Sequence, residues 1–232
     1  MPTVACSSKF CEMIKIRYFL TVGALWLTAS AAAAGWRAED QSGRMTLTTR
    51  GDTMEIVAPR GLTLWYDERL TGDYEIAYSV KFITDGGPYD RLSDMNCFWG
   101  ANDPGSPGDI YAAGTERGGF FPNYKAMKLF YVGYGGNHNT TTRFRLYRGL
   151  GAVAPDSVAR PLLGEYTAAD CLLRPGHWYR VSIRVKDGAT TYSVDGRELF
   201  TYRLGAEGAD GHFALRLLEN HVLVADFRIK NL

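Results

Sequence analysis

Residues 74–82 alternate strictly between large apolar side chains and small or polar ones. Tyr74, Ile76, Tyr78, Val80 and Phe82 therefore share one face, and this period of two is that of a β-strand with one buried face. The same period recurs in 179–185, 213–217 and 223–229, where the last run places Leu223, Ala225, Phe227 and Ile229 together. No helical period lasts for three turns. The pattern predicts a fold built from strands.

Turn signals separate these runs and predict that neighbouring strands are antiparallel. Asp187-Gly188 and Asp195-Gly196 stand between alternating runs, where Asp-Gly pairs are typical of tight hairpins. About a dozen strands joined in this way predict an all-β, two-sheet antiparallel sandwich formed by a single domain over 35–232. Two Gly- and Pro-rich stretches, 101–126 and 149–175, interrupt the pattern, and long irregular connections of this kind often carry function.

The first 34 residues have the pattern of a secretory signal peptide. Lys15 and Arg17 precede a short apolar run that ends in small residues and Ala31–Ala34. The run is shorter than a membrane-spanning helix requires, so we expect no stable membrane anchor. Met13 is an alternative start, because the residues before it add nothing to the signal. We expect cleavage between about Ala31 and Gly35, and a secreted or periplasmic mature protein.

Charge and cysteine content narrow the classes of partner and compartment. The formal net charge is +1 with both signs interspersed, so no basic stripe suggests binding to nucleic acid. Cys97 and Cys171 follow the predicted signal peptide and would enter an oxidising compartment. A disulfide between them and two buried free thiols are both compatible with the sequence.

Several motifs resemble the concanavalin A-like (laminin-G-like) jelly-roll family. They are HWYR at 177–180, YSVDGR at 192–197, GHFAL at 211–215 and VADFRI at 224–229. In addition, FWGANDP at 98–104 and YGGNHN at 134–139 are similar to uncharacterised secreted jelly-roll proteins of bacterial polysaccharide-utilisation clusters. The resemblance implies a jelly-roll sandwich and a polysaccharide or oligosaccharide partner. It implies no particular reaction, since this fold hosts hydrolases, lyases and binding proteins.

The strand predicted at 143–148 carries the strongest candidate site. Phe144 and Leu146 would face the core, which leaves Arg143, Arg145 and Tyr147 on the opposite face. Two guanidinium groups aligned in this way can hold a carboxylate, such as that of a uronic acid, by paired hydrogen bonds. His138 lies in the preceding loop between Asn137 and Asn139. A solvated sheet face beside an Asn- and Gly-rich turn is the alternative interpretation.

These residue types suit β-elimination from a uronic-acid polysaccharide. Arg143 or Arg145, with Asn139, would neutralise the carboxylate. His138 or a tyrosine would abstract the proton, and Tyr147 or Tyr134 would protonate the leaving oxygen. We predict a carbohydrate-active protein that acts on an acidic polysaccharide in this way.

Two alternatives use other residues. A glycoside hydrolase needs two carboxyl groups that flank the bond. The candidate acids are Asp90, Asp94, Asp103, Asp109 and Glu116. The competing interpretation is that these acids form turns and are solvated. A non-catalytic carbohydrate-binding protein would stack a sugar on Trp99 and bind hydroxyl groups through Asn102, whereas the competing interpretation of Trp99 is a core residue.

We predict no cofactor and no metal in the site. No spacing of His, Cys, Asp and Glu suggests zinc ligands, and a structural calcium near Asp226 is the one metal alternative that the resemblance suggests.

Overall fold

The computed structural model describes residues 35–232, so the predicted signal peptide lies outside the described residues. The strands are β1 (Trp36–Asp40), β2 (Thr46–Arg50), β3 (Thr53–Tyr66), β4 (Tyr74–Phe82), β5 (Met95–Asn102), β6 (Lys128–Gly135), β7 (Thr141–Arg148), β8 (Leu162–Tyr166), β9 (Trp178–Lys186), β10 (Ala189–Val194), β11 (Arg197–Arg203) and β12 (His212–Asn231). The helical elements are single turns: α1 (Gly114–Arg117), η1 (Phe121–Tyr124), α2 (Gly136–Asn139), α3 (Asp156–Ala159) and η2 (Ala169–Cys171).

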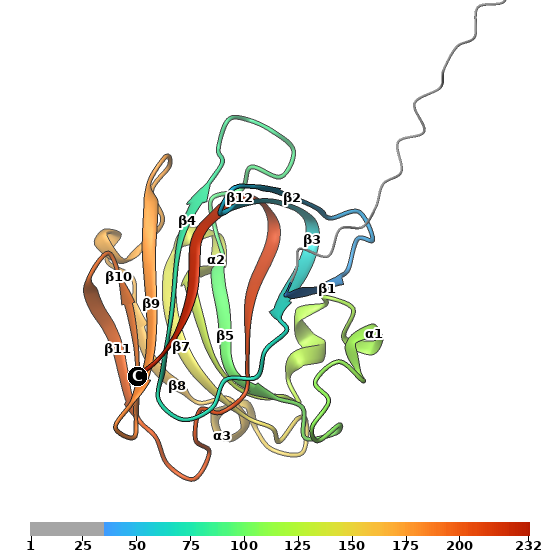
Figure 1. Ribbon diagram of the computed structural model, residues 1–232, viewed down its shortest axis with the longest axis vertical. Helices are drawn as coiled ribbons and strands as arrows, with labels where there is room; N and C mark the ends of the chain where they lie inside the picture. Colours follow the sequence, from blue (N-terminus) through green and yellow to red (C-terminus); the bar gives the residue numbers. More distant parts are fainter. Residues whose placement is uncertain (1–34) are drawn as a thin grey trace, which may run out of the picture. The chain divides into compact units, whose positions relative to one another are not determined.

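The twelve strands form two layers because β12 is long and bends. Its first arm pairs with β5 from His212 to Arg216, and its second arm pairs with β4 from Val222 to Asn231. A register shift between Leu218 and Asn220 marks the bend, which Figure 1 shows in red. All pairings are antiparallel, as predicted.

We call the two halves the β4 layer and the β5 layer. The β4 layer has the order β11-β10-β9-β4 and continues through the second arm of β12. The β5 layer has the order β8-β7-β6-β5 and continues through the first arm. β3 runs beside both arms of β12 and pairs with β2 near its start and with β1 near its end. The architecture confirms the predicted two-sheet antiparallel sandwich.

The main core lies between the layers and consists of the inward-facing residues. Trp99 lies at its centre, fully buried, with Phe130 and Phe144 stacked at 5.5 and 5.6 Å between ring centroids. Its indole N–H donates to Thr190 Oγ1 at 2.9 Å. Burial of this aromatic cluster removes a large apolar area from water, which is the main driving force for packing one sheet on another.

A second apolar cluster lies on the outer face of the β5 layer, which is the face turned away from the main core. Residues 103–127, which we call the cover segment, lie against this face and bury Trp65, Phe98 and Leu129 together with the segment's own Ile110, Tyr124 and Met127. The predicted irregular stretch 101–126 is therefore a structural cover over part of a sheet. No helix among residues 35–232 is long and apolar enough to span a membrane.

One expectation about the last strand is wrong in detail. Leu223 pairs with Glu55 and Lys81 on the outward side, and Ala225 precedes a register shift at 225–228. The inward residues are Val222 and Val224 before this bulge, and Phe227 and Ile229 after it. An extra residue in one strand reverses the alternation, so the run does not keep a single face.

The two cysteines of the sandwich are free and buried. Cys97 lies in the main core, where burial raises the pKa of its thiol to about 12. Cys171 lies in η2 at the edge of the core. The structure thus has the free-thiol arrangement, one of the two that the sequence left open.

Candidate functional site

A row of polar residues crosses the outer face of the β5 layer from one edge to the other. Strand register places seven positions side by side in the order Glu39, Thr63, Arg216, Asn96, Gly133, Arg143 and Glu165, of which all but Gly133 carry a polar side chain. We call this set the polar row. Polar residues on strands of this kind face away from the core because the inward positions are apolar.

The ends of the polar row are satisfied by ion pairs. At the β1 end, Arg117 of the cover segment donates to Glu39 Oε1 at 2.6 Å and to Asp103 Oδ2 at 2.7 Å, with all three side chains largely buried. At the β8 end, Arg143 donates to Glu165, and both side chains are partly exposed. The predicted carboxylate-binding role of Arg143 therefore competes with a carboxylate of the protein itself.

A pocket of about 600 Å³ opens beside the polar row, between β7, the cover segment and residues 156–162 of α3 and the start of β8. We call it the arginine pocket, and its lining residues are Phe121, Lys125, Arg145, Tyr147, Asp156, Ser157, Arg160, Pro161 and Leu162. Arg145 and Tyr147 point into it because they alternate with the inward-facing Phe144 and Leu146. The pocket thus contains two of the predicted site residues.

The arginine pocket is rich in positive charge. Lys125, Arg145 and Arg160 line it, whereas Asp156 is its single carboxylate. Arg160 pairs with Asp156, while Nη1 of Arg145 donates to the backbone carbonyl of Arg160 at 3.0 Å. Arg145 has no carboxylate partner within residues 35–232, so its other N–H donors remain available for a ligand.

Tyr147 supplies a hydroxyl group in the same pocket. Its ring is buried, and the guanidinium of Arg160 lies 5.9 Å from the ring centroid. Burial raises the pKa of Tyr147, and this outweighs the opposing effect of Arg145 and Arg160. The phenol is therefore protonated at neutral pH and acts as a hydrogen-bond donor or acceptor.

The other predicted catalytic residues lie elsewhere. His138 is exposed in the turn between β6 and β7, whereas Tyr147 lies opposite Leu129 near the far end of the same hairpin. The six residue-to-residue steps from Thr141 to Tyr147 correspond to roughly 20 Å. Tyr134 faces the core side, where its ring contacts Tyr179 at 5.6 Å between centroids. The structure does not bring His138, Tyr134 and Tyr147 together.

Asn137 and Asn139 have structural partners within the turn. Asn137 exchanges hydrogen bonds with Thr140, and the amide group of Asn139 both donates to and accepts from the backbone of Leu173. Asn137, His138 and Asn139 all have φ between 52 and 59°, so the turn is left-handed. Successive non-glycine residues rarely adopt this conformation, because each is strained.

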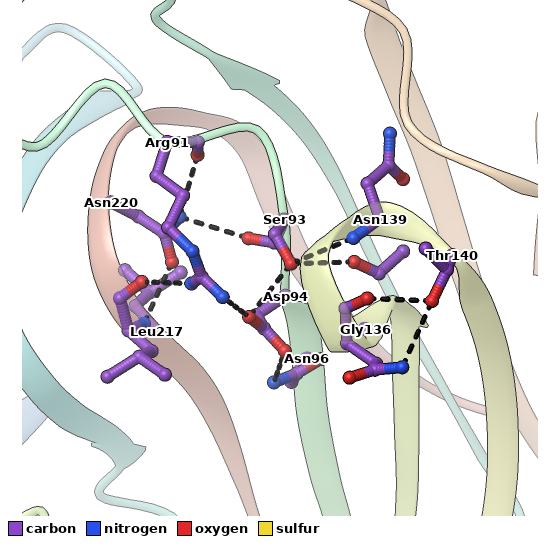
Figure 2. Close-up of polar contacts among 12 residues, drawn as sticks. Arg91, Ser93, Asp94, Asn96, Gly136, Asn139, Thr140, Leu217 and Asn220 are labelled. Carbon is purple, nitrogen blue, oxygen red and sulfur yellow. Dashed lines mark hydrogen bonds and ion pairs between the residues drawn. The ribbon is translucent and has the colours of Figure 1, made fainter.

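A largely buried network lies beside this turn and contacts it (Figure 2). Arg91 donates to Asp94 Oδ2 at 2.6 Å, and Ser93 Oγ lies 2.9 Å from the same oxygen. The backbone N–H of Asn139 donates to Ser93 Oγ at 3.2 Å, while Asn220 donates to the carbonyls of Arg91 and Ser93. The network ties the turn, the start of β5 and the bend of β12 into one unit.

Trp99 and Asn102, which would bind a sugar in the non-catalytic alternative, do not form a surface on which a sugar could stack. Trp99 is fully buried, so no face of its indole is available for stacking, which corrects that interpretation. Asn102 donates to the carbonyls of Gly100 and Asp210 and lines a different pocket of about 580 Å³. Asp226, the suggested calcium ligand, accepts a hydrogen bond from Ser79, and residues 35–232 contain no group of three His, Cys, Asp or Glu side chains suited to a metal.

Sequence reasoning missed the centre of the polar row. Arg216 and Asn96 stand alone among apolar residues, and only the register of β12 with β5 and β3 shows that they are neighbours. Tyr131, also missed, places its hydroxyl over Gly133, where a Cβ atom would lie 2.4 Å from that oxygen. Alternation did contain a signal for Arg216, because it stands between the inward-facing Leu215 and Leu217.

Solved structures of other proteins share this architecture. A Bacillus subtilis protein of unknown function with a galectin-like fold is 14% identical, with a TM-score of 0.63 over 85% of this chain and 90% of the other. Carbohydrate binding module CBM66 from Bacillus subtilis is 10% identical, with a TM-score of 0.53 over 85% and 96%. A Bacteroides ovatus mixed linkage glucan PUL GH16, in complex with a G4G4G3G product, is 11% identical, with a TM-score of 0.51 over 86% and 95%.

These likenesses confirm the predicted concanavalin A-like jelly roll, and at such low identity they show the fold alone. No curated protein matches the chain. A family profile, however, matches residues 56–227, which is most of the sequence. The chain therefore belongs to the family described as a domain of unknown function, DUF6250.

Proposed function

We propose that this protein is exported and binds an acidic carbohydrate in the arginine pocket. The observation that carries the proposal is the charge of the pocket, in which Lys125, Arg145 and Arg160 face a single carboxylate. Guanidinium groups bind carboxylate or sulfate through two parallel hydrogen bonds, and Arg145 keeps free donors for such a pair.

The pocket also provides surfaces suited to sugar rings. Phe121 contributes a partly exposed aromatic ring and Leu162 an apolar side chain that is 46% exposed. Binding sites for small ligands combine such apolar walls with a few polar groups that set orientation. The shared fold with a carbohydrate-binding module and the signal-peptide pattern of residues 1–34 are consistent with this proposal.

We favour binding over β-elimination or hydrolysis. Elimination needs a base beside the sugar, yet Tyr147 stays protonated and His138 lies at the other end of the hairpin. Hydrolysis by the common mechanism needs two carboxyl groups flanking the bond, and Asp156 is the single one that lines the pocket.

Calorimetric titration with a short oligogalacturonate tests the proposal. Arg145→Ala should lose about 2–5 kcal/mol of binding free energy, as when one member of a desolvated charge pair is removed. Arg145→Lys should restore little, because an ammonium cannot form the planar two-donor contact. The fully methyl-esterified oligomer, which is neutral, should bind wild type and both variants equally.

Arg184→Ala is the matched control. Arg184 is an exposed arginine on β9 in the other layer, so its removal should leave binding unchanged. Undiminished binding by Arg145→Ala, or no binding of any acidic glycan by wild type, would refute the proposal. The appearance of unsaturated products, seen by ultraviolet absorbance, would instead favour elimination.

A further inference from the structure

The polar row contains a buried arginine that lacks a carboxylate partner. Arg216 is 3% exposed, and Nη1 donates to the backbone carbonyl of Leu217 at 3.1 Å. Within residues 35–232 no Asp or Glu oxygen lies within ion-pair distance of its guanidinium group. Burial of an unpaired charge disfavours the folded state, and accordingly desolvation lowers the pKa of Arg216.

Unpaired polar atoms surround this arginine. Thr63 and Asn96 flank Arg216 across the sheet, and Thr63 Oγ1 and Asn96 Oδ1 are buried without a hydrogen-bond partner. Trp65 Nε1, two residues along β3 from Thr63, is likewise unpaired. Buried polar groups in proteins are almost always paired, so several exceptions at one place require an explanation.

Two aromatic rings of η1 pack over the buried guanidinium group of Arg216. The guanidinium carbon lies 5.5 Å from the ring centroid of Phe121 and 5.8 Å from that of Tyr124. Tyr124 is fixed, because its hydroxyl donates to Glu39. The Phe121 ring, by contrast, can form no such hydrogen bond; it packs against Phe98, Tyr131 and Arg216, and it also lines the arginine pocket. Phe121 is therefore the shared wall between the pocket and Arg216.

We infer that Phe121 moves aside when ligand binds, and that the arginine pocket then extends to Arg216, which pairs with a second anionic group of the same acidic oligosaccharide. This inference rests on the proposed function and specifies its ligand. Arg216 and Arg145 lie on β12 and β7, with β5 and β6 between them, so their backbones are separated by roughly 14 Å across the sheet. A single sugar cannot reach both, whereas an oligosaccharide can.

The test compares galacturonate with trigalacturonate on wild type and Arg216→Met. The methionine has a similar length but no charge. We expect at least a thirtyfold loss of trimer affinity, unchanged monosaccharide affinity, and a melting temperature equal to or above that of wild type. A merely structural arginine would give the opposite pattern, with a lower melting temperature and normal trimer binding, and that result would overturn the inference.

Further variants keep the outcome decisive. Arg216→Lys replaces the methionine variant as the test if the latter does not fold. It retains the positive charge without the two-donor fork, and we expect at least a tenfold loss of trimer affinity. Phe121→Ala should raise the association rate of the trimer, since it removes the wall. An unchanged rate would refute the movement of Phe121. Maltotriose sulfate in place of trigalacturonate distinguishes a sulfate from a carboxylate as the anionic group.

Failure of this inference differs from failure of the proposed function. Trimer binding that depends on Arg145 but not on Arg216 leaves the proposed function intact and removes the second anion site. Absence of both monosaccharide and trimer binding to wild type removes both proposals.

Discussion

At the scale of single residues, Arg117 fixes the cover segment to the sheet. Its guanidinium group bridges Glu39 of β1 and Asp103 near the start of the segment, and it also donates to the carbonyl of Ile110. The side chain is only 4% exposed. An arginine that is paired on all sides differs physically from Arg216, which is equally buried and has no carboxylate partner among the described residues.

Removal of Arg117 should therefore destabilise the protein strongly. Arg117→Met leaves the two buried carboxylates without a positively charged partner, which costs about 3–5 kcal/mol of unfolding free energy. Arg37→Ala is the control, because the Arg37–Asp67 pair is exposed and such pairs contribute at most about 1 kcal/mol. Urea unfolding measures both. Equal effects of the two variants would show that the buried network contributes no special stability.

The limits of sequence reasoning are clearest for individual site residues. Alternation correctly places Arg145 and Tyr147 opposite Phe144 and Leu146. The alternation pattern cannot predict that Trp99 lies in the core, since the burial of Trp99 depends on which layer covers its strand. Alternation does place Arg216 outward, between Leu215 and Leu217, but it cannot show that Arg216 is buried, because that burial results from a segment about ninety residues earlier in the chain.

At the scale of elements, the hairpins were predictable and the bent strands were not. The run at 74–82 corresponds to β4, and Asp-Gly turns correctly separate β9, β10 and β11. β3 and β12 each serve both layers, and the bulges that bend them reverse the alternation. The short edge strand β8 lies in a stretch with little period and escaped prediction for that reason.

The left-handed turn between β6 and β7 is a strained element with a testable energy. His138 is exposed, has a φ of 58°, and its side chain forms no hydrogen bond with another described residue. Glycine adopts this conformation without a steric penalty, so His138→Gly should be about 1 kcal/mol more stable than His138→Ala. Thermal unfolding of the two variants measures the difference. An alanine variant as stable as the glycine variant would mean that the backbone is not strained there.

At the scale of the whole molecule, β3 and β12 make the two layers interdependent. The first arm of β12 completes the β5 layer and the second arm completes the β4 layer, while β3 pairs with both arms. Because β12 belongs to both layers, its loss from one layer would also remove it from the other. The aromatic core lies between the two layers. The outer face that carries the polar row is therefore only as rigid as the complete sandwich.

This connectivity predicts one cooperative unfolding transition for residues 35–232. Far-ultraviolet circular dichroism reports the strands of both layers, whereas tryptophan fluorescence includes the signals of Trp65 on the outer face and of Trp99 in the main core, which are both buried. The two signals should give the same urea midpoint, because a two-state transition has no populated intermediate.

Saturating trigalacturonate should raise both midpoints together, since a ligand that binds only the native state stabilises the whole cooperative unit. An earlier fluorescence transition would show instead that the cover segment detaches before the sandwich unfolds, in which case the polar row would become accessible by local unfolding rather than by movement of Phe121.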